Sequence, residues 1–161
     1  MKLNYGVLVL KQGNMKSIVF FLAFLSIPFL ANGQLRLITG KVVDEFQFEP
    51  IPAVEIQTLD TVRLGNTDIK GNFKIGLPVG TDQLLLSFIG MEWTSIRIPA
   101  NCNNLEIIML FDGTYCFMTP RRVIRKRYRI FKNLSKKHYQ AHSQGIFTSI
   151  VPCVTYIFRK Y

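Results

Sequence analysis

The chain has 161 residues, of which 48% are hydrophobic, so it is long enough for one ordinary domain with an appendage and too apolar to be disordered throughout. The formal net charge is +10, but residues 34–112 carry six Lys/Arg against ten Asp/Glu, whereas residues 113–161 carry eleven Lys/Arg and no acid. The composition therefore excludes a domain that is basic throughout and predicts a basic arm attached to a mildly acidic domain.

The first 33 residues have the parts of a secretory signal peptide. A lysine precedes an unbroken apolar run at residues 18–31, and Ala31 and Gly33 supply small side chains at positions −3 and −1, so cleavage is expected before Gln34. A membrane-spanning helix is the alternative, but it needs about 20 apolar residues. This run is shorter and contains Pro28. The sequence therefore predicts export, to the periplasm, the outer membrane or the exterior.

The chain is expected to divide into three segments. Residues 1–33 form the signal peptide, residues 34–112 a β-sandwich, and residues 113–161 a basic helical tail with a short apolar C-terminal segment. Met15 would make a cleaner start, so the alternative that residues 1–14 lie upstream of the start codon in use stays open.

After the signal peptide, apolar and polar residues alternate with a period of two, and turn residues interrupt them every 8 to 12 positions. This pattern is typical of a sandwich or small barrel. Phe73, Ile75 and Leu77, for example, alternate with less apolar neighbours, which indicates one buried and one solvated face. Seven strands are expected, at residues 36–44, 53–59, 62–67, 72–77, 83–89, 93–98 and 105–111.

Two turn signals separate these strands with a clear mechanism. Pro52 removes a backbone donor, so the second strand is expected to begin after it. Residues 68–71 are predicted to form a hairpin turn in which the Asp68 carboxylate accepts backbone N–H groups and Gly71 takes a positive φ.

Five short motifs occur in a recognisable order: ITGKVVD (residues 38–44), PIPAVEI (50–56), TDIKGNFKI (67–75), LPVG (77–80) and LSFIG (86–90). Each motif alone is weak, but the five in register resemble the carboxypeptidase-regulatory-like domain over about residues 36–110.

The resemblance implies an all-β fold, a seven-stranded immunoglobulin- or transthyretin-like (prealbumin-like) sandwich of the carbohydrate-binding-like type. It also implies an exported or outer-membrane-associated protein of the Bacteroidetes type. Two residues depart from the family pattern: Ala53 stands where the family usually has glycine, and Met91 where an aromatic residue usually follows Ile-Gly. The family has no catalytic residues in this domain, so neither departure affects a site.

The residues themselves also disfavour an enzyme. A zinc carboxypeptidase needs a His-x-x-Glu pair and a distant histidine, whereas the only histidines are His138 and His142, and no acid follows Asp112. The two histidines could share a helix face, but no third ligand is close in sequence, so polar residues near a helix end are the favoured interpretation. No metal or cofactor is predicted. A solvated loop is likewise favoured over a cation site for the acids around the first turn, Asp44, Glu45 and Glu49.

Three cysteines in an exported chain predict one disulfide and one spare thiol. Cys102 and Cys116 flank the strand expected at residues 105–111, which at about 3.4 Å per residue carries the chain about 20 Å away. Bridged Cα atoms lie within about 7 Å of each other. A Cys102–Cys153 bridge is therefore favoured, with Cys116–Cys153 second, and either bridge would tie the basic tail to the sandwich.

An amphipathic helix is expected from Thr119, the N-cap before Pro120, to a stop at Gly145. Its apolar stripe at helical spacing consists of Ile124, Tyr128, Phe131 and Leu134. Residues 121–137 carry nine cations and no anion, so a partner outside the helix must offset their repulsion. The predicted docking face consists of Arg121, Arg122, Arg125, Lys126, Arg129, Lys132 and Lys136.

Three partners could offset this charge. The acidic sandwich is the first, which would leave the far face of the helix solvated. An anionic lipid or glycolipid surface is the second, at about 1 kcal/mol per Lys or Arg. Nucleic acid is the least favoured, because an exported protein rarely meets it. The apolar residues 146–158 are expected to form one or two short strands on the core, with Phe147, Val151, Val154 and Tyr156 as packing candidates.

The sequence therefore predicts an exported, non-catalytic accessory or binding module of the cell envelope, whose basic helix docks on an envelope protein, an anionic lipid or a glycan. The alternative is a carbohydrate-binding module of the same fold. Trp93, Tyr115 and Phe117 could stack on a sugar, although packing in the core or in an interface is the favoured interpretation for each of them.

Overall fold

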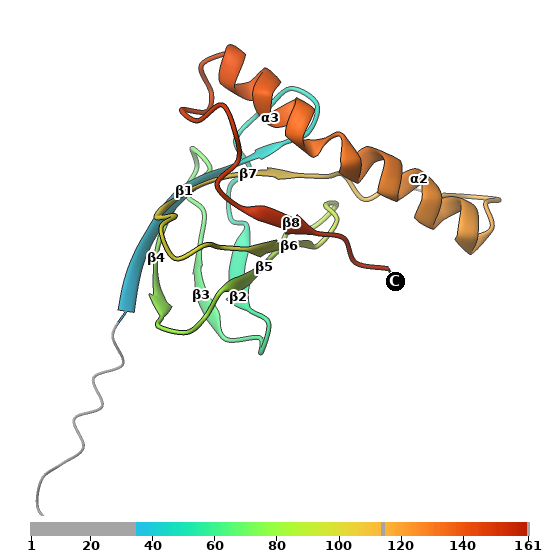
Figure 1. Ribbon diagram of the computed structural model, residues 1–161. Helices are drawn as coiled ribbons and strands as arrows, with labels where there is room; N and C mark the ends of the chain where they lie inside the picture. Colours follow the sequence, from blue (N-terminus) through green and yellow to red (C-terminus); the bar gives the residue numbers. More distant parts are fainter. Residues whose placement is uncertain (1–34, 114, 161) are drawn as a thin grey trace, which may run out of the picture. The chain divides into compact units, whose positions relative to one another are not determined.

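The computed structural model describes residues 35–113 and 115–160, and the predicted signal peptide lies outside them. The described residues form two sheets. In strand order the first sheet is β4 (Asn72–Pro78), β1 (Leu35–Asp44) and β7 (Asn104–Met109). The second is β3 (Arg63–Asn66), β2 (Glu55–Thr58), β5 (Gln83–Ser87), β6 (Thr94–Arg97) and β8 (Thr155–Ile157). Two helices, α2 (Pro120–Lys132) and α3 (Leu134–Ser143), connect β7 to β8 (Figure 1).

The two sheets enclose one apolar core, as expected for a β-sandwich. β1 is the central strand of the first sheet, antiparallel to β4 and parallel to β7. Period-two alternation builds this core: Phe73, Ile75 and Leu77 of β4 are at most 5% exposed, while Lys74 between them faces solvent. The other strands contribute Ile38, Val42, Ile56, Leu84, Leu86, Ile96, Leu105 and Ile107.

All seven expected strands are present. The sandwich has eight strands among the described residues and not seven, because β8, which lies where one or two short strands were expected at residues 146–158, joins the second sheet. β8 pairs antiparallel with β6 at the edge of the second sheet. The second strand also begins later than expected, at Glu55, because Ala53 has a φ of +57° and cannot continue an extended strand. Ala53 stands where related domains usually have glycine, the residue that adopts this conformation without strain.

A second hydrophobic cluster covers the outer face of the first sheet. On the sheet side it contains Val43, Ile108 and Leu110, and on the other side Leu134, Ala141 and Phe147. It therefore joins residues from both sides of the predicted boundary at residue 112, and the segment after that boundary packs as part of the fold.

The helical segment is divided, in contrast to the single helix expected between Thr119 and Gly145. Asn133 ends α2 and begins α3 with φ −84° and ψ −3°. Pro120 begins α2 as expected, but the Thr119 side chain makes no capping hydrogen bond. Gly145 follows α3 with φ +73°, where its N–H donates to the carbonyl of His142.

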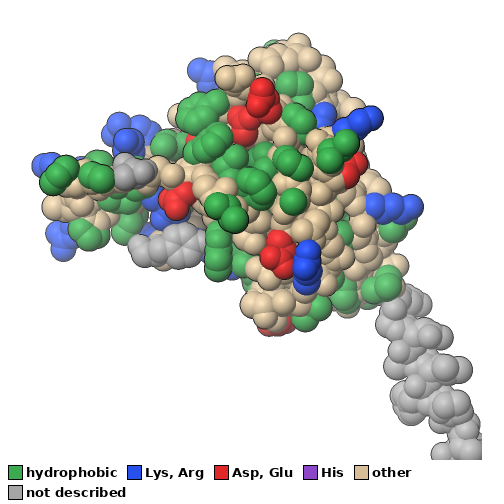
Figure 2. Space-filling view, turned by 180° about the vertical axis from the view of Figure 1, so that it is seen from behind, with side chains coloured by type: hydrophobic (Ala, Val, Ile, Leu, Met, Phe, Trp, Pro, Cys, Tyr) green, Lys and Arg blue, Asp and Glu red, His purple; other side chains and the backbone are tan. Residues whose placement is uncertain are grey.

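The first helix, α2, projects beyond the sheets, and its far end lies away from them (Figure 1). Seen from behind, Lys and Arg side chains lie beside hydrophobic ones at this projecting end (Figure 2). Neither α2 nor α3 is long and apolar enough to cross a membrane, and no other helix occurs among the described residues.

Candidate interaction surface

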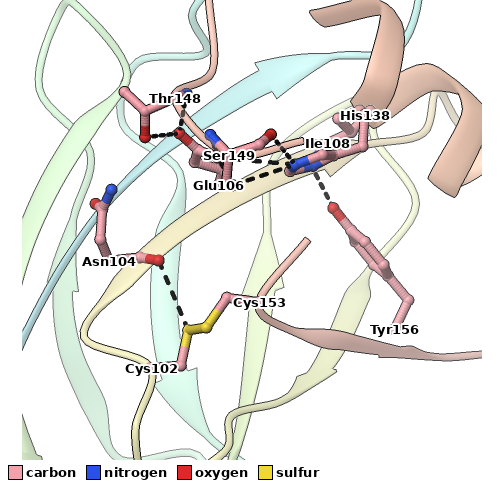
Figure 3. A network of polar contacts seen from close by, with 9 residues as sticks. All are labelled: Cys102, Asn104, Glu106, Ile108, His138, Thr148, Ser149, Cys153 and Tyr156. Atoms are coloured by element: carbon pink, nitrogen blue, oxygen red, sulfur yellow. Dashed lines mark hydrogen bonds and ion pairs between the residues drawn. A yellow bond between two sulfur atoms is a disulfide. The ribbon is translucent and has the colours of Figure 1, made fainter. Parts of the chain in front are cut away.

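The C-terminal extension is fastened to the sandwich by a buried carboxylate on β7. Glu106 lies on the same face of β7 as Ile108, between strand neighbours that point into the first core. Its carboxylate accepts four hydrogen bonds, from the backbone N–H groups of Thr148 (2.5 Å) and Ser149 (3.2 Å) and from both of their hydroxyls (Figure 3). Burial alone would raise the pKa of Glu106, but these hydrogen bonds outweigh it and hold the pKa below its usual value. The carboxylate is therefore charged and fully used within the fold.

His138 of α3 completes this cluster from above β7. The ring is fully buried, and its Nε2 donates to the carbonyl oxygen of Ser149 at 3.0 Å. Burial lowers the pKa of His138, although the Glu106 carboxylate lies 3.7 Å from Nε2. The histidine is therefore a neutral packing residue beside Phe147, whose ring centroid is 4.8 Å away. The sequence placed His138 near a helix end without predicting its burial, and the structure buries it within α3.

Two further contacts hold the segment before and within β8. A disulfide joins Cys102, ahead of β7, to Cys153, ahead of β8, with 6.0 Å between their Cα atoms (Figure 3). The Tyr156 hydroxyl accepts the N–H of Ile108 at 2.8 Å, which satisfies a donor on the free edge of β7. Burial raises the pKa of Tyr156 far above its usual value, so the hydroxyl stays protonated.

The inner face of the two helices pairs its cations with acids of the sandwich. Arg127 makes a bidentate contact with Glu92, at 2.6 Å and 3.0 Å, and both side chains are nearly buried. Lys137 lies 3.3 Å from the Glu45 carboxylate and donates to the Glu45 carbonyl at 2.6 Å. Arg127 is buried, so it does not belong to the group of exposed cations around it on α2.

The outer face of the helices carries seven exposed cations, which we call the basic face: Arg121, Arg122, Arg125, Lys126, Arg129, Lys132 and Lys136. At 100° per residue, the six on α2 lie within an arc of about 140°, and Arg127 lies about 100° beyond its edge. Lys126 and Lys132 lie over the rings of Tyr115 and Tyr128. Within residues 35–113 and 115–160, none of the seven forms an ion pair. The sandwich therefore offsets the inner cations and leaves the outer ones available.

The segment just before α2 exposes an aromatic ring. Phe117 is 107% exposed relative to its reference state and has a φ of +60°. Cys116 beside it is exposed and is the one of the chain's three cysteines that the disulfide does not use. Phe117 is therefore not a core residue, and the other half of the expectation, packing in an interface, stays a prediction.

A shallow groove of about 540 Å³ runs between α2 and the end of the sandwich. Trp93 and Tyr115 line it together with Asp112 and the Arg127–Glu92 pair. Trp93 is 54% exposed, and burial raises the pKa of Tyr115. Two of the three aromatic residues considered for stacking on a sugar thus share one groove, whereas Phe117 does not line it.

Comparison with known proteins bears on the identity of the sandwich. Residues 38–115 match the family model of the CarboxypepD_reg-like domain. This stretch of the sandwich therefore belongs to the CarboxypepD_reg-like family, and β8 lies outside the match. Members of this family are regulatory, non-catalytic modules, and the match indicates no catalytic family.

Two other comparisons add little to the match with the CarboxypepD_reg-like domain. The chain is similar to part of the cryo-EM structure of the E. coli P pilus tip assembly intermediate PapC-PapD-PapK-PapG in the second conformation, at 8% identity and a TM-score of 0.37. That likeness covers 50% of this chain and 10% of the other, so the matched part spans about a tenth of that chain's length. No curated protein matches the sequence.

Several residues predicted for the CarboxypepD_reg-like domain have the expected contacts. Asp68 accepts the N–H groups of Lys70 (2.9 Å) and Asn72 (2.8 Å), and the hydrogen bond from Asn72 is the main cause that lowers the pKa of Asp68. Gly71 has a φ of +72°, and an added Cβ would lie 2.5 Å from the carbonyl oxygen of Val42, so glycine is needed there. The favoured Cys102–Cys153 pairing is the one that forms.

The expectation of a solvated loop is wrong for Asp44 and Glu45, which are 8% and 6% exposed. The Asp44 carboxylate accepts three backbone N–H groups within its own turn, and Glu45 contacts Lys137. No group of three or more potential metal ligands occurs in the described part of the chain. Among the apolar candidates of the C-terminal segment, Val151 is 71% exposed and does not pack.

Sequence reasoning missed the roles of Glu106 and Arg127. Two signals were available. Glu106 is a charged residue inside the apolar stretch LEIIML, and Arg127 is a cation on the predicted apolar face of the helix. Neither signal identifies its partner, because Thr148, Ser149 and Glu92 are 42, 43 and 35 residues away in sequence.

Proposed function

We propose that this protein is an exported, non-catalytic accessory module of the cell envelope that docks on an anionic surface through its basic face. Three observations support the proposal: the regulatory family of its sandwich, the signal-like segment at residues 1–33, and the exposed cations of α2. The basic face carries the argument, because the same helix pairs its inner cation with an acid of the sandwich and leaves the outer ones unpaired within the described residues.

The expected interaction is electrostatic and additive. Each Lys or Arg near an anionic surface contributes about 1 kcal/mol at physiological ionic strength, and the contribution falls as salt shortens the Debye length. Because the six cations of α2 lie on one arc, they can face a flat surface together. All six cations can therefore contribute to the free energy of binding to a flat anionic surface, whereas only one or two could contact a small ligand.

The test is binding of the purified protein to anionic and neutral vesicles across a salt series. The variant Arg121→Gln/Arg122→Gln/Arg125→Gln removes three charges from the basic face. The matched control Arg63→Gln/Lys70→Gln/Lys74→Gln removes three exposed charges from the sandwich. We expect the first variant to bind anionic vesicles at least tenfold more weakly and the control to change binding less than twofold. Equal losses would show that only the net charge matters and would refute the basic face.

A second candidate is a carbohydrate-binding module, favoured by the groove that Trp93 and Tyr115 line with Asp112. Aromatic rings stack on sugars, and a carboxylate accepts hydrogen bonds from their hydroxyls. The test is calorimetric titration with neutral oligosaccharides, comparing Tyr115→Ala with Tyr139→Ala, an exposed tyrosine on α3. This candidate requires salt-insensitive binding that Tyr115→Ala abolishes and Tyr139→Ala retains, and its absence would leave docking through the basic face alone.

A further inference from the structure

We propose that the anionic surface is a phospholipid bilayer and that Phe117 inserts into it, with the projecting end of α2 held at the level of the headgroups. This inference rests on the proposed function and adds the kind of surface, the orientation of the molecule and the residue that enters the apolar phase.

Phe117 combines an exposed aromatic ring with an unfavourable backbone conformation. Its ring is fully solvated, although a phenylalanine gains most when its whole surface leaves water. Its backbone has a φ of +60°, a conformation that a bulky residue rarely adopts. The turn at Tyr115–Met118, where the N–H of Met118 donates to the carbonyl of Tyr115 at 3.3 Å, supports this backbone conformation. An apolar phase outside the protein would supply the missing contact.

The neighbours of Phe117 suit the boundary between headgroups and acyl chains. Arg121 and Arg122 follow within the first turn of α2, and residues 113–161 contain no acid that would be repelled by anionic lipid. Basic side chains that reach phosphate groups while an adjacent aromatic ring enters the acyl region are typical of proteins that lie at this interface. A polyanion without an apolar phase could use the arginines but would leave the ring in water.

The position of α2 allows this contact. The Arg127–Glu92 pair and the contacts of Phe131 with Phe158 hold the second half of α2 to the body of the protein. The start of α2 projects beyond the sheets (Figure 1), where hydrophobic and basic side chains lie together (Figure 2). Arg121 and Arg122 belong to this first turn, and Phe117 precedes Pro120 by three residues. The segment from Phe117 to the first turn of α2, which we call the tip, can therefore contact a bilayer while the sandwich stays in water.

The experiment places a fluorescent reporter at the tip of the full-length protein. Trp93 is the only tryptophan, so the variant Trp93→Phe/Phe117→Trp has a single tryptophan at position 117. On vesicles of phosphatidylglycerol and phosphatidylcholine we expect a blue shift of its emission and quenching by lipids brominated along the acyl chain. Because Trp93→Phe could perturb folding, an environment-sensitive dye on the free thiol of Cys116 gives a second measurement in the otherwise unchanged protein.

Affinity at high salt separates insertion from charge. At 0.5 M salt, where the electrostatic part is screened, Phe117→Ser is expected to weaken vesicle binding about tenfold. The control Ile69→Ser removes an apolar side chain that is 84% exposed from the turn between β3 and β4 and should change binding less than twofold. Binding at low salt without a blue shift or quenching would overturn insertion and leave the basic face intact. No binding to these vesicles even at low salt would overturn both proposals.

Discussion

The inner and outer faces of the C-terminal helices both carry cations, but in opposite environments. On the inner face Arg127 and Lys137 each meet a carboxylate of the sandwich, and His138 is neutral and buried. On the outer face seven cations of the same two types remain exposed and form no ion pair within the described residues. A basic segment is therefore not one uniform feature, because helical periodicity divides its charges between those that stabilise the fold and those that are free for a partner.

The largest effect is expected from the disulfide, which holds the whole extension to the sandwich. Its cysteines are 51 residues apart, so closing this loop lowers the entropy of the unfolded chain and raises its free energy by about 4 kcal/mol. The double variant Cys102→Ala/Cys153→Ala should lower the free energy of unfolding by about that amount in denaturant titrations. Cys116→Ala, which removes only an exposed thiol, is the control and should unfold like the wild type. An unchanged midpoint for the double variant would contradict a role for the bridge in stability.

The next effect concerns the buried carboxylate of Glu106. Glu106→Gln leaves donors of Thr148 and Ser149 without a charged acceptor and is expected to cost about 3 kcal/mol. The control Glu55→Gln alters a substantially exposed ion pair with Arg63 and should cost less than about 0.5 kcal/mol. Equal unfolding free energies for the two variants would contradict the comparison between buried and exposed charges.

The pH dependence of stability provides a further measurement on the same variant. The folded-state pKa of Glu106 lies below its usual value, so its contribution is complete above that usual value, about 4.5, and is lost as the pH falls through the lower folded-state pKa. Wild-type protein should therefore lose stability in this acid range, and Glu106→Gln should lose less. An identical acid slope in both proteins would show that Glu106 is not responsible.

A smaller effect is expected where the two helix faces can be compared directly. Arg127→Ala leaves the Glu92 carboxylate, 12% exposed, without its bidentate partner and should cost about 2 kcal/mol. Arg129→Ala, two residues along the same helix, should change stability by less than about 0.5 kcal/mol. Combining Arg127→Ala with Glu92→Gln should recover part of the loss, and additive losses would contradict direct coupling of the pair.

The smallest effect on stability is expected from the outer face. The triple variant Arg121→Gln/Arg122→Gln/Arg125→Gln should unfold within about 0.5 kcal/mol of the wild type, because these exposed side chains form no ion pair within the described residues and repel one another. Thermal melts would check this, alongside the loss of vesicle binding. A large destabilisation would mean that the outer cations support the fold, which would undermine their assignment to a partner.

Local pattern predicted the sandwich well because its strands alternate and its turns use residues with one preferred geometry. Asp68 and Gly71 are an example, since both act within a four-residue turn. The disulfide could be predicted in part, because strand length disfavours Cys102–Cys116 and so selects Cys153 as one partner, but it leaves Cys116–Cys153 open beside the Cys102–Cys153 pair that forms. The break of the helix at Asn133 and the burial of Arg127 could not be predicted, because each depends on where the extension meets the sandwich.

By itself the sequence determined the strands between residues 35 and 109, the turn at Asp68, the choice of Cys153 and the division of charge along the chain. These depend on the period of two, on turn geometry and on chain length, which are local properties. Only the tertiary structure decided that β8 completes the second sheet, that Glu106 binds the loop before it, and which cations remain exposed. The physical reason is that a buried charge needs a partner, and its partner is chosen by packing between segments that are distant in sequence.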